Sequence, residues 1–206
     1  SLWWRFGIDH QARLLAKIEV NNARTDNALA KRKAMLEQMA LNLSERIKSL
    51  EQDVATIKAK IAFQHKKDLI GPFDLKIINS SAIDLSGLEF VLYYPQHKKS
   101  IQLVADVPAH STVTLDDVIP RVLLKADFTA EIITCNIMDN AAKARDALAQ
   151  LEQGRITEAA LSFSFIRKGY ADLQALDREL KELELTGTRL ERKLAEVRDG
   201  KIWPWQ

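Results

Sequence analysis

Residues Leu36–Ile61, LEQMALNLSERIKSLEQDVATIKAKI, carry apolar side chains at spacings that alternate between four and three residues. The positions are Leu36, Ala40, Leu43, Ile47, Leu50, Val54, Ile57 and Ile61. Such a series returns to one face of an α-helix and is typical of a coiled-coil seam. Because no proline interrupts Gln11–Leu69, we expect a first helical arm over residues 11–69.

A second proline-free stretch, Asn140–Gly200, predicts a second arm over residues 139–200. Its apolar positions are Ala159, Phe163, Ile166, Tyr170 and Leu173, followed in a new phase by Leu176, Leu180, Leu183, Leu190, Leu194 and Val197. The three-residue step between the two phases is a stammer, which locally overwinds a coiled coil. Gly154 should weaken the helix near its start, and Gly187 would let two backbones approach closely.

The intervening residues 70–138 alternate in polarity with a period of two, which predicts a small β domain. We expect five strands, at Phe73–Asn79, Leu88–Tyr94, Ser100–Val107, Thr112–Leu115 and Phe128–Ile137. The second of these strands has a mostly apolar face and an opposite face that carries Val91 and Tyr93. That opposite face either packs on a helix or binds a partner. The expected fold class is therefore α+β: a long antiparallel coiled-coil helical hairpin with a small antiparallel β domain, resembling a minimal β-sandwich, inserted between its helices.

Antiparallel pairing of the two arms would determine which of their residues lie side by side. Residues whose numbers add to about 208 should lie side by side, so the polar stretch Glu19–Lys33 would face Ala175–Arg189. A stripe of leucines on the second arm would then have no apolar cover, and it comprises Leu176, Leu180, Leu183, Leu190 and Leu194. We expect this stripe to bind a partner, either in a homo-oligomer or with another helical protein.

The chain ends are rich in aromatic residues. Trp3, Trp4, Trp203 and Trp205 are its four tryptophans, and they fall in an N-terminal foot, residues 1–10, and a C-terminal foot, residues 201–206. Tryptophan favours the membrane–water interface because its ring is apolar while its N–H stays hydrated. We expect these four residues to lie near a membrane, beside a spanning segment that would precede Ser1. A clasp of the rings on one another and a protein-binding foot are the alternatives.

Catalytic and metal-binding patterns are sparse. His10, His65, His97 and His110 have no cysteine or carboxylate at ligand spacing, so we expect no metal and no cofactor. Asp116 and Asp117 are interpreted as a solvated turn, and the single cysteine, Cys135, as a buried strand residue. The sequence also lacks a glycine-rich phosphate loop and a serine elbow. We therefore expect no enzymatic activity and no small-molecule substrate.

Charge composition names no partner class. The 206-residue chain has 30 Lys and Arg against 28 Asp and Glu, a net charge of +2, which is far from the balance of a dedicated nucleic-acid binder. Short basic clusters such as Lys31–Lys33 and His97–Lys99 also occur on ordinary solvated helix faces and turns. Nucleic acid is thus an unlikely partner, while anionic lipid or an acidic protein surface remains open.

The architecture resembles prefoldin-type chaperones, which also join two coiled-coil arms through β hairpins. Its strand rhythm is similar to that of small immunoglobulin-like modules on envelope proteins. We interpret the chain as a non-enzymatic scaffold, assembly or adaptor protein whose stalk presents the β domain to a protein partner. It would be membrane-associated in a bacterial envelope, with the periplasmic side slightly favoured over the cytoplasmic side. The alternative is a holdase-like chaperone that grips non-native chains with an exposed stripe from Leu176 to Leu194.

Overall fold

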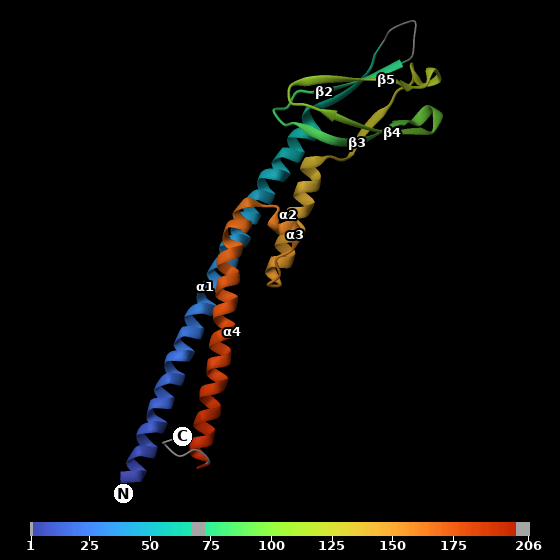
Figure 1. Cartoon of the computed structure of the whole chain (residues 1–206). Helices are drawn as coiled ribbons and strands as arrows, with labels where there is room; N and C mark the ends of the chain where they lie inside the picture. Colours follow the sequence, from blue (N-terminus) through green and yellow to red (C-terminus); the bar gives the residue numbers. More distant parts are fainter. Residues whose placement is uncertain (1, 67–72, 201–206) are drawn as a thin grey trace. The chain divides into compact units, whose positions relative to one another are not determined.

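The structure is a computed structural model that describes residues 2–66 and 73–200. It has the expected α+β composition, with long helices and two small antiparallel sheets (Figure 1). The chain divides into two compact units. The first comprises Ser1–Asn42 and Leu161–Gln206, and the second comprises Leu43–Ala160.

Four α-helices account for most of the described residues. They are α1 (Leu2–Lys60), α2 (Asn136–Glu152), α3 (Glu158–Leu161) and α4 (Ser164–Arg198). Helix α1 contributes residues to both units. Two short 3-10 turns, η1 (Pro95–His97) and η2 (Arg121–Leu123), belong to the second unit.

The first unit is built from α1 and α4, which run alongside each other in opposite directions (Figure 1). Asn21 lies beside Gly187, and Met39 lies beside Gly169. The residue numbers of the two pairs add to the same total, as antiparallel pairing requires. The buried face of α1 in this unit carries Leu14, Asn21, Ala28 and Met39, and that of α4 carries Ile166, Leu173 and Leu194.

This buried face of α1 differs from the one expected. The spacing of Leu36–Ile61, continued backwards along the helix, predicts as core positions two leucines and four polar residues, namely Leu29, Leu15, Lys33, Asp26, Asn22 and Glu19. The structure instead buries the residues one position earlier, Leu14, Asn21 and Ala28. Ala28 is smaller than Leu29, so α4 can approach more closely at this position, and the observed register also leaves Glu19, Asp26 and Lys33 in water. Consequently, Leu15 and Leu29 remain exposed.

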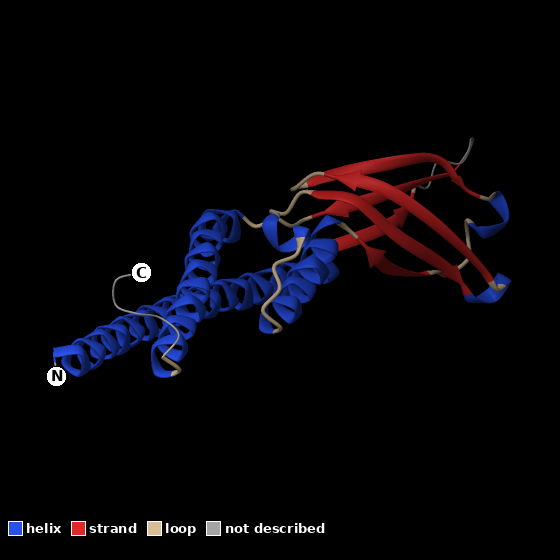
Figure 2. Ribbon diagram, turned by 60° about the horizontal axis from the view of Figure 1, so that its bottom comes forward, coloured by secondary structure: helices blue, strands red, loops and turns tan. Residues whose placement is uncertain are grey.

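The second unit contains six strands in two three-stranded antiparallel sheets. The strands are β1 (Ile61–His65), β2 (Phe73–Asn79), β3 (Leu85–Tyr94), β4 (Lys99–Val107), β5 (Ser111–Ile119) and β6 (Thr129–Thr134). Their order is β1-β2-β5 in one sheet and β4-β3-β6 in the other. The sheets face each other as a sandwich (Figure 2), as one apolar face on each sheet requires.

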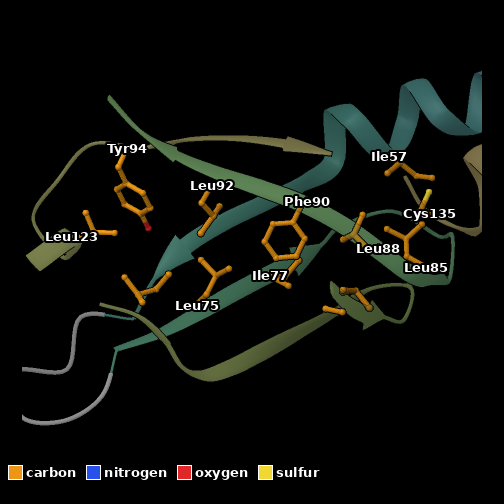
Figure 3. Close-up of a cluster of buried hydrophobic side chains, with 13 residues drawn as sticks. Ile57, Leu75, Ile77, Leu85, Leu88, Phe90, Leu92, Tyr94, Leu123 and Cys135 are labelled. Atoms are coloured by element: carbon orange, nitrogen blue, oxygen red, sulfur yellow. The ribbon is translucent and has the colours of Figure 1, made fainter. Parts of the chain in front are cut away.

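The core of this sandwich lies between the two sheets (Figure 3). Leu75 and Ile77 come from β2, while Phe90 and Leu92 come from β3, and all four side chains are fully buried. The ring of Phe63 lies 4.5 Å from that of Phe90, measured between centroids. Alternating inward residues on both sheets therefore form one continuous apolar layer.

Helices α1 and α2 also pack together in the second unit. Leu43, Leu50 and Ile57 of α1 are buried at intervals of seven residues, and the alanines of α2 at positions 141, 144 and 147 are buried at intervals of three. An ion pair of 3.6 Å joins Arg145 to Glu51 across the two helices. Alanine permits a short distance between helix axes, so the leucines of α1 fill the space between the helices.

The structure corrects three expected boundaries. Helix α1 ends at Lys60 rather than near Leu69, because residues 61–65 form the edge strand β1, whose side chains alternate in burial. The second arm is interrupted by the turn at Gly154, which has a φ of +76°, before α3 and α4. The last expected strand ends at Thr134, since Asn136 already begins α2.

Candidate functional site

The N-terminal turns of α1 expose a dense set of large apolar side chains. This N-terminal apolar segment consists of Leu2, Trp3, Trp4, Phe6 and Ile8. Trp4 retains 71% of its surface in contact with solvent, and Arg5 adds a positive charge within the segment. Trp203 and Trp205, which were expected to lie near a membrane with Trp3 and Trp4, are outside the described residues. Among the described helices, none is long and apolar enough to cross a membrane.

A second exposed aromatic residue lies on the outward face of the β4-β3-β6 sheet. Tyr93 is 43% exposed and pairs with Ser100 on one side and Thr129 on the other. Because these hydroxyl side chains are short, they cover little of the Tyr93 ring. Val91, the next residue of β3 on this face, is half-buried between Gln102 and Glu131.

The same sheet face carries an exposed aliphatic side chain. Val104 pairs with Glu89 and is 56% exposed. Together with Val91 and Tyr93 it forms what we call the outer sheet face. A tyrosine surrounded by small polar and aliphatic groups has the composition of a protein-binding surface, because its ring offers contact area at a low cost in conformational entropy.

The leucine stripe of the second arm is less exposed than the sequence analysis expected. Leu176, Leu180, Leu183 and Leu190 are half-buried, and Leu194 is buried. They share the face of α4 that contains Gly187, which lies against Asn21 of α1. Helix α1 therefore covers much of the stripe within the first unit. The stripe is therefore less exposed than the holdase alternative expects.

A shallow groove lies between α1 and α4 in the first unit. It has a volume of about 430 Å³ and is lined by Ala16, Lys17, Val20, Asn21, Arg24, Thr186 and Leu190. Lys17 and Arg24 are its charged residues, so the groove is apolar at its base and positive at its rim. It is wide open to solvent, and no carboxylate is among the residues that line it.

The second unit contains a pair of interacting titratable side chains that the sequence analysis did not anticipate. His65 Nε2 lies 2.8 Å from the hydroxyl oxygen of Tyr94, and His65 Nδ1 lies 3.4 Å from the carbonyl oxygen of Leu124. A proton on Nδ1 can be donated to that carbonyl, so Nε2 is free to accept the hydrogen bond from Tyr94. Phe128 stacks on the imidazole with 4.5 Å between ring centroids.

Burial controls the protonation of this pair. It lowers the pKa of His65 from its ordinary value of 6.5, although the Leu124 carbonyl opposes the shift. It also raises the pKa of Tyr94 to about 12. Each change favours the neutral form. His65 and Tyr94 satisfy each other's hydrogen-bonding groups among the surrounding aromatic rings. Such an arrangement is typical of residues that stabilise a fold. The alternation of β1 and β3 could have indicated that both side chains point inward.

The remaining candidate residues are dispersed. Asp116 and Asp117 are exposed at an irregularity in β5, where Asp117 has a φ of 53° and its N–H donates to Asp74 Oδ1 at 3.0 Å. This strand position replaces the turn that we expected. Cys135 is fully buried as expected, at the boundary between β6 and α2. Over residues 2–66 and 73–200, no group of three or more histidine, cysteine or acidic side chains is placed to hold a metal ion.

Comparison of the chain with models of protein families, with curated proteins and with solved structures finds no match. The functional argument therefore depends on the surfaces described above.

Proposed function

We propose that this chain is a non-enzymatic scaffold or adaptor that attaches to a membrane surface through its N-terminal apolar segment and presents a β domain to a protein partner. The observation that carries the proposal is the exposure of Leu2, Trp3, Trp4, Phe6 and Ile8 within the first turns of α1. Burying one such side chain contributes roughly 1.5–3 kcal/mol. Five such side chains that keep 44–76% of their surface exposed therefore favour a binding surface.

The chemistry of the segment favours a lipid interface over an apolar ligand pocket. Tryptophan rings are stable at the headgroup level, where the ring is buried and the N–H remains hydrated. Arg5 supplies a cation that can pair with lipid phosphate, and Arg13 follows two turns later. A helix end with aromatic and basic residues binds anionic bilayers by combining both contributions.

The helical part of the chain would act as the stalk. We propose that α1 and α4 form an antiparallel coiled-coil hairpin, supported by the contact between Asn21 and Gly187 and by the ion pair of 2.7 Å between Arg32 and Asp177. The ion pair is partly exposed and contributes less than about 1 kcal/mol. Its value is to fix the register of the two helices.

The outer sheet face would be the surface offered to the partner. Tyr93 and Val104 are exposed there, while Val91 supports them from the middle strand. Their contact area suits a protein surface better than a small molecule, since the sheet is not hollowed at this point. A stalk of this kind in a bacterial envelope would favour the periplasmic side. The basic residues of α1 would favour the cytoplasmic side by the positive-inside rule.

Vesicle flotation tests the proposal. Vesicles of phosphatidylcholine mixed with phosphatidylglycerol should carry the unaltered chain to the top of a density gradient. They should shift its tryptophan emission to shorter wavelength as the rings leave water. The double substitution Trp4→Ser with Phe6→Ser should reduce binding at least tenfold, because it removes two exposed rings without touching the core.

Tyr93→Ser is the matched control, since it removes an exposed ring from the other compact unit and should leave flotation unchanged. The proposal fails if the unaltered chain stays at the bottom of the gradient. It also fails if the double variant floats as well as the unaltered chain, because binding would then not depend on the N-terminal apolar segment.

A further inference from the structure

Strand β4 is an edge strand of the second unit. Within the part of the chain that the structure describes, it pairs with β3 alone. The backbone N–H and C=O groups along its other side therefore have no strand partner. Such a row of groups is a template for another extended chain, and folded proteins normally protect the edges of their sheets against it.

The other three edge strands of the described sheets have features that hinder such pairing. Strand β1 is only five residues long. Strand β5 is bulged, because its residues between Leu115 and Ile119 outnumber those of β2 opposite them, and Asp117 there has a φ of 53°. Strand β6 is bulged at Ile133, which has no partner in the register with β3. Short length and bulges both protect a sheet edge.

Strand β4 has none of these features. Every residue from Lys99 to Ala105 pairs in an unbroken register, and the irregularity beyond it is an insertion in β3. No proline interrupts β4. Ile101 and Leu103 pack against the core of the sandwich but are only half-buried, and Val104 on the opposite face is 56% exposed. The strand is therefore a regular edge whose apolar side chains are partly in water.

The charges of this edge are complementary to those of a second copy. Lys98 and Lys99 lie at the start of β4 and Asp106 lies near its end, and all three are exposed. Asp106 Oδ1 accepts a hydrogen bond of 2.8 Å from the Gly87 N–H, but among the described residues none of the three forms an ion pair. Antiparallel pairing of two β4 strands centred on Gln102 would place the lysines of each copy beside the aspartate of the other. A parallel arrangement would place lysine beside lysine, which is destabilising.

The same pairing also matches the uncharged side chains of β4. On the inner face, Ile101 of one copy would lie opposite Leu103 of the other. On the outer face, Ser100 would lie opposite the second copy's Val104. Ser100 also pairs with Tyr93 of β3, so a small residue would separate the exposed tyrosine ring from that valine. The ring could then lean across the serine, and apolar surface that is exposed in a single chain would be covered.

We infer that two copies of this chain dimerise by antiparallel pairing of their β4 strands around Gln102. The two three-stranded β4-β3-β6 sheets would then form one continuous sheet, and the two outer sheet faces would adjoin. The inference does not depend on membrane attachment, because the N-terminal apolar segment belongs to the other compact unit.

Site-specific oxidation of the full-length chain tests this pairing. Cys135 is fully buried, so a thiol introduced by Gln102→Cys, at an exposed position, would be the reactive one. Opposite residues of an antiparallel pair have Cα atoms about 4.5–5.5 Å apart, which a disulfide can bridge. With diamide as the oxidant, this variant should form a disulfide-linked dimer in a non-reducing gel. Val104→Cys is the matched control on the same face of the same strand. Its two copies would be about 13 Å apart, so it should cross-link at least tenfold more slowly.

Sedimentation velocity without lipid supplies an independent readout. The unaltered chain should sediment as a dimer at micromolar concentration. Asp106→Lys and the double substitution Lys98→Glu with Lys99→Glu should each weaken dimerisation at least tenfold, whereas the triple variant that combines them should restore it. Lys143→Glu, at an exposed position of α2, is the control for a change of charge and should remain dimeric. A monomeric unaltered chain would overturn the inference. Dimers that none of the β4 substitutions weakens, or equal cross-linking of the two cysteine variants, would do the same.

Discussion

Asn21 of α1 lies directly against Gly187 of α4. A Cβ atom added to Gly187 would be 3.0 Å from Asn21 Nδ2, and the same amide nitrogen donates a hydrogen bond of 3.1 Å to the carbonyl oxygen of Leu183. Asn21 is only 8% exposed. The missing side chain at position 187 therefore makes the space in which a buried amide reaches the backbone of the opposite helix.

Gly187→Ala should destabilise the first unit by about 1 kcal/mol. Alanine gains about 1 kcal/mol in helix propensity over glycine, but its methyl group would displace the Asn21 amide and leave a buried polar group without its partner, which costs about 1–3 kcal/mol. Urea unfolding followed by circular dichroism measures the difference. Gly7→Ala is the control, because nothing lies within 4 Å of a Cβ there, and it should be neutral or stabilising.

The α+β composition and most strands could be predicted from the sequence because their periodicity is local. The edge strand β1 could not, since Ile61 continues the four-and-three spacing of the helix while Phe63 and His65 already alternate as strand residues. The helix ends where pairing with β2 supplies hydrogen bonds that the helix would otherwise provide. Whether residues 61–65 form helix or strand therefore depends on pairing with β2, which comes later in the chain.

The buried face of α1 is the larger failure of the sequence analysis, and it changed the candidate site. A heptad extrapolated from Leu36 to Leu15 assumes that the contact face keeps one phase. Burial instead follows Leu14, Asn21 and Ala28, a register that leaves the charged side chains of Glu19, Asp26 and Lys33 exposed to water. The sequence therefore indicated an uncovered leucine stripe on α4, whereas the leucines of that stripe are at least half-buried and Leu15 and Leu29 of α1 are exposed. The sequence did indicate the aromatic N-terminal segment, and Trp3 and Trp4 are exposed in the structure.

Asn79→Ala should destabilise the β sandwich by about 3 kcal/mol or more. The side-chain nitrogen of this buried residue donates to the carbonyl oxygens of Ile83, Val107 and Pro108 at 2.8–3.1 Å. Its oxygen accepts from the backbone N–H and the hydroxyl of Ser81. Truncation would leave several buried polar groups without hydrogen-bond partners at once.

Thermal unfolding measures the effect of Asn79→Ala on stability. Asn140→Ala is the control, because it is at an exposed position and should change stability by less than about 0.5 kcal/mol. Equal effects of the two substitutions would contradict a structural role for the network.

Ala144→Leu should cost about 1–3 kcal/mol of stability in the second unit. Ala144 is fully buried on the face of α2 that packs against α1, and a larger side chain would force the two helices apart. Ala142→Leu adds the same atoms at an exposed position of the same helix, and should change stability by less than about 0.5 kcal/mol. Chemical denaturation of both variants provides the comparison. If Ala144→Leu is as stable as Ala142→Leu, the interface between α1 and α2 is looser than the burial of these alanines indicates.

The stability of the sandwich should decrease as the pH falls below about 6.5. Burial lowers the pKa of His65 in the folded chain below its ordinary value of 6.5, so the unfolded chain binds a proton first as the solution becomes acidic. Stability therefore continues to fall until the pH is below the lowered pKa, where both states are protonated and the lost stability stays constant. Urea midpoints measured from pH 8 downward should show this decrease.

His65→Gln should flatten the curve below pH 6.5, because glutamine can accept the Tyr94 hydrogen bond but does not titrate. His97→Gln, at an exposed position, should leave the curve unchanged. A His65→Gln curve that keeps the full decrease would assign it to other groups.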